Sequence, residues 1–137
     1  MKNVDYIIVG MGIAGLVFSK TLRDHGKSFV VIDSPKQGAT KASGGVLNPT
    51  VLKRFTPAWN TVEFVLKAGT FYESLARDIG QQVLSGVAIH RILASVEEQN
   101  NWMVASDKEI LSRFLSPEIL KNNNTAISAS FGLGAVT

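Results

Sequence analysis

Three glycines near the N-terminus have the spacing that a dinucleotide needs for contact with the backbone. Gly10, Gly12 and Gly15 form the pattern Gly-x-Gly-x-x-Gly, with Ile13 and Ala14 before the last glycine. The first glycine permits a tight turn, the second leaves room for a pyrophosphate, and the third lets a helix pack closely on a strand. A helix that begins at this turn also offers free N–H groups to phosphates. The motif therefore predicts a dinucleotide-binding turn.

An acidic residue follows at the distance expected for a contact with ribose. Asp33 ends a second apolar run, roughly 20 residues after the glycines. A carboxylate at this place accepts hydrogen bonds from ribose hydroxyl groups, and its charge repels a 2′-phosphate. We therefore expect a dinucleotide other than NADP. The glycines and the acid do not by themselves choose between NAD and FAD.

The apolar pattern predicts the elements that position these residues. The continuous apolar run Tyr6 to Val9 is typical of a parallel strand that is buried on both faces. Helical spacing then extends from about Met11 to His25, with Gly26 as a C-terminal cap, and a second strand covers Ser28 to Asp33. Strand, helix and strand in this order predict a βαβ unit with a parallel sheet.

Downstream of this unit the pattern changes to loops and mixed elements. A Gly-, Ser- and Thr-rich loop is expected from Ser34 to Thr50, and a loop of that length is often functional. The elements expected after it are a helix from Ala58 to Ile79, a strand from Gln82 to Leu93 bent at Gly86, a helix from the capping box Ser95/Glu98 to Ala105, a strand or helix from Ile110 to Leu115 stopped by Pro117, a turn at Asn122 to Asn124, and a strand from Ala126 to Phe131.

Composition excludes several classes of protein. The 137 residues are 45% hydrophobic and 18% charged, which describes a globular chain and excludes disorder. No apolar run is long enough for an integral membrane span, since Lys20, Arg23 and Asp24 interrupt the most hydrophobic stretch. Without a signal peptide, the expected location is cytoplasmic. The absence of cysteine excludes disulfides and thiolate metal sites, and basic residues scattered among acidic ones argue against a nucleic-acid partner.

Other residues that could carry chemistry have simpler interpretations. His25 and His90 are isolated and are interpreted as structural, so no metal site is expected. Lys53 and Arg54 could face a carboxylate or a phosphate, although a solvated surface is the simpler interpretation. Asn48, before Pro49, is interpreted first as a turn residue, although its side chain could also approach a bound cofactor. Four aromatic residues on the predicted helix from Ala58 to Ile79 are expected in the core: Trp59, Phe64, Phe71 and Tyr72.

The loop after the second strand carries a resemblance to a known family. From Gly38 to Pro49 the sequence resembles the FAD-dependent D-amino acid oxidase superfamily, which includes glycine oxidase and sarcosine oxidase. Members have the glycine motif, an acid after the second strand, and a Ser/Thr-, Ala- and Gly-rich loop that runs along the cofactor toward the flavin. The long helix and the strand from Leu84 to Ile92 are also similar to the family's entry into its substrate domain. The loop residues similar to the family position by position are Thr40, Ala42, Ser43, Gly44, Gly45, Val46 and Pro49.

The resemblance implies a cofactor, a reaction and a domain plan. It implies FAD as the cofactor and oxidation of a C–N bond of a small amine or amino acid, by hydride transfer to the flavin. The fold class expected is α/β, with a Rossmann-like FAD-binding βαβ unit in residues 1–80 and the start of an α+β substrate domain in residues 81–137. The residues expected to bind the cofactor are Gly10, Gly12, Ile13, Ala14, Gly15, Asp33, Ser34, Thr40, Ala42, Ser43, Gly44, Gly45 and Val46. No residue is identified as catalytic.

Members of this family are longer and return later with further strands of the flavin domain. The chain is therefore expected to be an N-terminal fragment that is inactive alone, holds FAD weakly, and exposes a strand edge that permits a homo-oligomer. Two alternatives stay open at this point. One is an NAD-binding or nucleotide-sensing module without redox turnover, and the other is an interaction fragment that binds no nucleotide.

Overall fold

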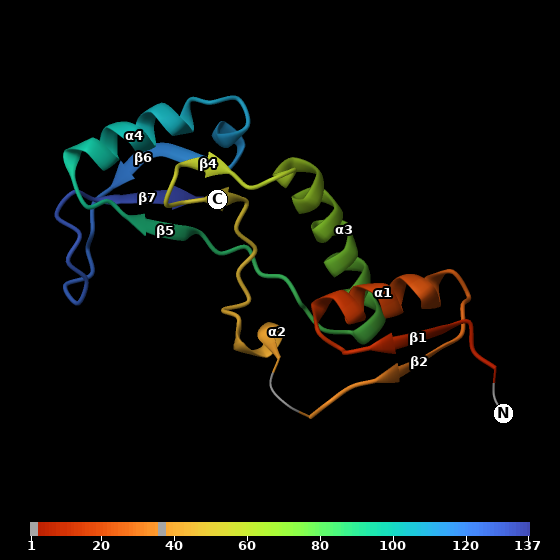
Figure 1. Ribbon diagram of the computed structural model, residues 1–137. Coiled ribbons are helices and arrows are strands. Elements are labelled where there is room, and N and C mark those ends of the chain that lie inside the picture. Colours follow the sequence, from red (N-terminus) through yellow and green to blue (C-terminus); the bar gives the residue numbers. More distant parts are fainter. Residues whose placement is uncertain (1–2, 36–37) are drawn as a thin grey trace. The chain divides into compact units, whose positions relative to one another are not determined.

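The computed structural model describes residues 3–35 and 38–137, which divide into two compact units (Figure 1). Unit 1 covers residues 1–46 and unit 2 covers residues 47–137. Residues 36 and 37 of the predicted loop lie outside the described part. The split into domains 1–80 and 81–137 stays a prediction, because a compact unit need not be a functional domain. The elements in chain order are β1 (Tyr6–Val9), α1 (Ile13–Asp24), β2 (Phe29–Ile32), α2 (Ala39–Ala42), β3 (Thr50–Val51), β4 (Thr56–Pro57), α3 (Thr61–Ile79), β5 (Ile89–Ile92), α4 (Val96–Ser106), the 3₁₀ turn η1 (Leu111–Arg113), β6 (Leu115–Leu120) and β7 (Leu133–Val136).

Unit 1 is a βαβ unit with a two-stranded parallel sheet. Strand β1 pairs with β2 in parallel, in the register that sets Val9 opposite Ile32. The predicted strand, helix and parallel strand are thus confirmed. The prediction that β1 is buried on both faces is wrong for this structure: Ile8 is 5% exposed, whereas Val9 is 81% exposed. The reason is that β1 has one neighbouring strand, β2, and that α1 packs on the face of β1 that carries the Ile8 side chain.

A side-chain clasp joins the beginnings of the two parallel strands. The carboxylate of Asp5 accepts hydrogen bonds from the backbone N–H of Ser28 at 2.8 Å and from its hydroxyl at 2.7 Å. These bonds, the hydroxyl first, lower the pKa of Asp5. The clasp holds β1 and β2 in register at the end opposite the glycine turn.

Unit 2 is built around a three-stranded antiparallel sheet in the order β5-β7-β6. Its core forms where α4 packs on this sheet, and Trp102 of α4 is fully buried at the centre. The indole N–H of Trp102 donates to the carbonyl of Ser116 at 2.8 Å, so its polar atom is satisfied. The ring lies directly over Gly134 of β7, where an added Cβ would come within 2.6 Å of Cζ2. The sheet can therefore accept the tryptophan only because this position has no side chain.

Two predictions for the C-terminal part are wrong. Pro117 does not stop an element but lies within β6, which the order of strands places at an edge of the sheet, where proline is tolerated. The register of β6 with β7 is irregular between Leu115 and Ile119, around this proline. The last strand is β7 and not the run from Ala126 to Phe131, which forms turns. The apolar residues Ile127 and Phe131 of that run are exposed, whereas β7 is the central strand of the sheet.

The middle of the chain also differs from expectation. The predicted loop from Ser34 to Thr50 contains the short helix α2, a hairpin of β3 and β4 begins at its last residue, and Pro57 belongs to β4. Helix α3 therefore begins at Thr61, and it ends before Gly80, which adopts the left-handed conformation expected of a cap. Strand β5 is limited to the last part of the predicted strand.

The expectation that the aromatic residues of this region lie in the core is wrong for two of them. Trp59 is 83% exposed and pairs edge-to-face with Phe64, which is also exposed. Phe71 and Tyr72 are partly buried and contact each other. Within unit 2 no other element packs extensively on α3, and Thr61 is its one buried residue.

The predicted capping box at the start of α4 is confirmed. The Ser95 hydroxyl oxygen accepts from the N–H of Glu98 at 3.1 Å. The Glu98 carboxylate accepts from the N–H of Ala94 at 2.9 Å and from the Arg91 guanidinium at 2.8 Å. The bond from Ala94, followed by Arg91, lowers the pKa of Glu98 against the opposing effect of burial. The Glu98 carboxylate thus contributes to the cap of α4 and also holds Arg91 of β5 in place.

We predict that Gly134→Ala destabilises unit 2. A methyl group at this position overlaps the buried ring of Trp102, so the free energy of unfolding should fall by about 1 to 3 kcal/mol. Denaturant unfolding followed by tryptophan fluorescence measures the change. Gly86→Ala is the matched control, since a Cβ there meets open space. Equal stability of the two variants would contradict the packing described.

We also predict that Glu98 contributes a pH-dependent part of the stability. Because its pKa is lowered in the folded state, its contribution is fully present above the ordinary value of 4.5 and is lost as pH falls through the folded value. Unfolding measured from pH 6 down to about pH 3 should show a steeper loss for the wild type than for Glu98→Gln. Parallel curves for the two proteins would show that the carboxylate contributes nothing.

Candidate functional site

The glycine turn and the acid lie at the same edge of the parallel sheet. Gly10 continues the ladder beyond β1, since its N–H donates to the carbonyl of Ile32 at 2.8 Å. Asp33 follows Ile32 directly and is exposed. The chain thus leaves both strands at their carboxyl ends, the edge where ligands bind in parallel α/β sheets. The structure brings the predicted phosphate-binding turn and the predicted ribose contact to one edge.

The conformation of the turn explains two of its three glycines. Gly10 has a φ of +91°, which a residue with a side chain rarely adopts. A Cβ on Gly15 would overlap the carbonyl oxygen of Gly10 and come within 3.6 Å of the Ile8 side chain. The roles predicted for Gly10 in the tight turn and for Gly15 in close packing are confirmed.

The third glycine lies beside a threonine from the loop. A Cβ on Gly12 would be 3.3 Å from Oγ1 of Thr40. This oxygen accepts a hydrogen bond from the N–H of Ile13 at 3.0 Å. Thr40 therefore caps α1 from 27 residues away, where Gly12 has no side chain to do so. The hydrogen of its own hydroxyl is left to donate to a ligand.

The start of α1 has the electrostatics of an anion site. The N–H groups of the first helical turn have no acceptor within the helix, and Thr40 satisfies that of Ile13. No acidic residue lies in this turn, so the positive end of the helix dipole is not neutralised there. Gly12, Ile13 and Ala14 are exposed, which leaves the backbone accessible. The arrangement can hold the phosphates of a nucleotide.

The remaining predicted site residues lie along the loop without joining this cluster. Ala42 ends the short helix α2, and the Ser43 hydroxyl donates to the carbonyl of Thr40 at 2.8 Å. Gly45 has a φ of +65°. In residues 38–46, Thr40 alone has a hydrogen bond to the glycine turn. Four other predicted residues are exposed: Ser34, Gly44, Val46 and Asp33.

The capping contact of Thr40 is a feature that sequence reasoning missed. The loop similarity included Thr40 but did not place it on α1. A usable signal was present, because Gly12 cannot cap the helix with a side chain, so an acceptor from elsewhere is required. Asn48, in contrast, behaves as the turn residue expected, since its side-chain oxygen accepts from the N–H of Thr50 at 2.9 Å.

His25 makes a structural contact. The Nδ1 atom of His25 lies 2.8 Å from the carbonyl of Thr21, at the end of α1. Within residues 3–35 and 38–137, no group of three or more acidic or histidine side chains is arranged to hold a metal ion. None of the helices in this described part is long and apolar enough to cross a membrane.

Comparison with known proteins gives one family match. No solved structure matches the chain. Residues 5–54 match the family described as FAD binding domain, a segment that contains the glycine turn, Asp33 and the Thr40 loop. FAD is therefore the cofactor, and the match supports an FAD-dependent oxidoreductase.

Proposed function

We propose that the protein oxidises the C–N bond of a small amine or amino acid and passes the hydride to FAD. The observation that carries the proposal is the meeting of the glycine turn, the start of α1 and Thr40 at one edge of the sheet, inside the FAD-binding segment. The substrate class is supported by the resemblance of the loop from Gly38 to Pro49 to amine-oxidising flavoproteins. The family match favours this flavin function over an NAD module.

The residues at this edge fit the polar half of FAD. The exposed backbone at Gly12 to Ala14 would lie against the pyrophosphate, with the Thr40 hydroxyl as an additional donor. The Asp33 carboxylate would accept from the ribose. The loop from Ala42 to Val46 would continue toward the ring system. In this Rossmann-like arrangement the chain binds and orients the cofactor.

FAD supplies the redox chemistry when bound, because its ring accepts the hydride. The contribution of the described residues is binding and positioning. No side chain among them is assigned as a catalytic acid, base or nucleophile.

We predict that Gly12→Val abolishes FAD binding, since the valine side chain enters the space of the pyrophosphate and also meets Thr40.

We also predict that Asp33→Ala, at an exposed position, weakens FAD binding by about 1.5 to 3 kcal/mol through loss of a charge-assisted hydrogen bond. Quenching of flavin fluorescence during titration measures both affinities.

Gly69→Ala is the matched control, because a Cβ at that helical position meets open space. Amide hydrogen exchange at Ile8 reports whether unit 1 remains folded in each variant. Wild-type FAD affinity in a folded Gly12→Val protein would contradict the phosphate assignment, and unchanged affinity in Asp33→Ala would remove the acid from the site.

The substrate class is tested by pairs of compounds with the same carbon skeleton. The FAD-loaded protein is mixed without oxygen with glycine or glycolate, and with alanine or lactate, and loss of oxidised-flavin absorbance is followed. The amino acids should reduce the flavin and the hydroxy acids should not. Reduction by the hydroxy acids alone would overturn the C–N assignment while leaving the FAD site intact.

A further inference from the structure

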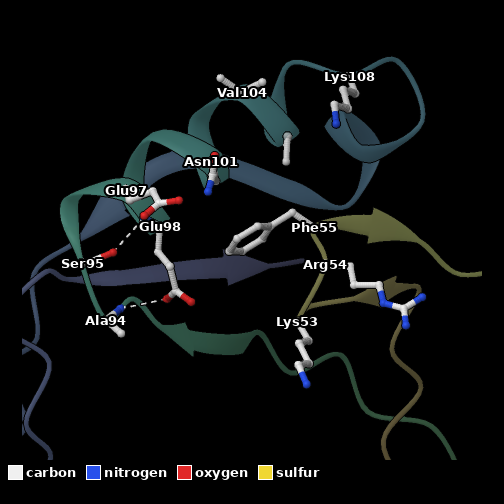
Figure 2. Close-up of a pocket in the computed structure, with 11 residues that line it drawn as sticks. Lys53, Arg54, Phe55, Ala94, Ser95, Glu97, Glu98, Asn101, Val104 and Lys108 are labelled. Atoms are coloured by element: carbon white, nitrogen blue, oxygen red, sulfur yellow. Dashed lines mark hydrogen bonds between the residues drawn. The ribbon is translucent and has the colours of Figure 1, made fainter.

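Unit 2 contains a cavity whose lining includes none of the residues proposed to bind FAD. Its volume is about 610 Å³, within the range of pockets for small molecules. It lies between the turn that joins β3 to β4 and the helix α4, with Phe55 reaching into it (Figure 2). All the residues that line it belong to unit 2, so its shape depends on that unit alone.

Three cations at this cavity have no carboxylate partner among the residues that the structure describes. Lys53 and Arg54 lie on the β3–β4 turn, and Lys108 follows the end of α4. All three are exposed, and no ion pair or hydrogen bond engages their side chains in the described part of the chain. Elsewhere in unit 2, Lys67 pairs with Glu63 and Arg91 pairs with Glu98. The rim of the cavity thus has positive charge available to a ligand.

The charge at the cavity remains positive when its acidic residues are included. Glu98 is already engaged by Arg91 and by the N–H of Ala94. Glu97 is exposed and has no ion pair among the described residues, so it reduces the attraction for an anion without cancelling the charge of the three cations. The capping box closes the start of α4, and an anion would therefore depend on the three cations.

Phe55 gives the cavity a fixed apolar surface. Its ring packs edge-to-face on the buried Trp102, with centroids 5.9 Å apart, and the Arg91 guanidinium carbon lies 5.7 Å from its centroid. Its backbone φ is +50°, an uncommon conformation for a bulky residue. Such strain persists only where the surroundings hold it, and it is frequent at ligand sites. The ring is only partly buried, so one part remains for contact with a ligand.

We propose that this cavity binds a small aromatic monocarboxylate. The aromatic ring of the ligand packs on Phe55, and its carboxylate pairs with Lys53 and Arg54, with Lys108 adding to the positive field. Ring contact and charge are both required, which selects against simple anions and against neutral aromatic molecules. All the residues of this site belong to unit 2, and the proposal does not depend on the proposed oxidation.

The proposal is tested by NMR titration of the whole chain, without FAD, using three probes. Phenylacetate has ring and charge, phenylacetamide has the ring alone, and acetate has the charge alone. Phenylacetate should bind most tightly and shift the amide signals of Phe55, Ala94 and Asn101. Higher salt should weaken its binding, because the cations are exposed.

Variants distinguish binding at this cavity from a general electrostatic attraction of phenylacetate to the protein. Lys53→Gln and Arg54→Gln should each weaken phenylacetate about two- to fivefold, the effect of one exposed charge pair. Lys121→Gln, which removes an exposed lysine outside the cavity, should leave the affinity unchanged. The proposal would be overturned if phenylacetamide bound as tightly as phenylacetate or if Lys121→Gln lost as much affinity as the cavity variants. It would also be overturned if the signal shifts were confined to residues outside the cavity. FAD affinity is not involved in any of these outcomes.

Discussion

The close approach of α1 to β1 is the constraint on which the cofactor site depends. Gly15 faces the carbonyl of Gly10 with no room for a Cβ, so the helix begins directly behind the turn that leaves the strand. This approach aims the first N–H groups of α1 at the carboxyl edge of the sheet, where Asp33 emerges from β2. If the helix stood further from the strand, the glycine turn, the helix end and the acid would not share one edge.

In unit 2 a glycine likewise leaves room for a helix to pack closely on a strand. A buried tryptophan of α4 is accommodated because β7 has a glycine beneath the ring. The same ring supports Phe55, and through it the hairpin of β3 and β4 is anchored to the sheet. Arg91 is fixed between Phe55 and Glu98, which links β5 to the start of α4. A small number of contacts therefore shapes both the core and the cavity beside it.

The sequence predicted those features that depend on local pattern. The βαβ unit, the acid after β2, the Ser95 cap and the Gly80 terminus follow from spacing and from residue chemistry within one or two turns of the chain. Features set by distant partners were not predictable in this way. Pro117 was expected to end an element, but its place in an edge strand depends on which strands pair with β7. Likewise the exposure of Trp59, just before α3, depends on which elements pack beside it, and periodicity does not specify this.

The bond from Ile13 to Thr40 has a consequence for the thermodynamics of ligand capture. It ties the loop to the start of α1 while the chain is alone, so the Thr40 hydroxyl is already placed beside the exposed backbone of the turn. A loop that is ordered only by its ligand loses conformational entropy at that moment, which weakens the observed affinity. Here part of that entropy is lost during folding. An incoming phosphate therefore meets donors that are preorganised, and more of its interaction energy remains as affinity.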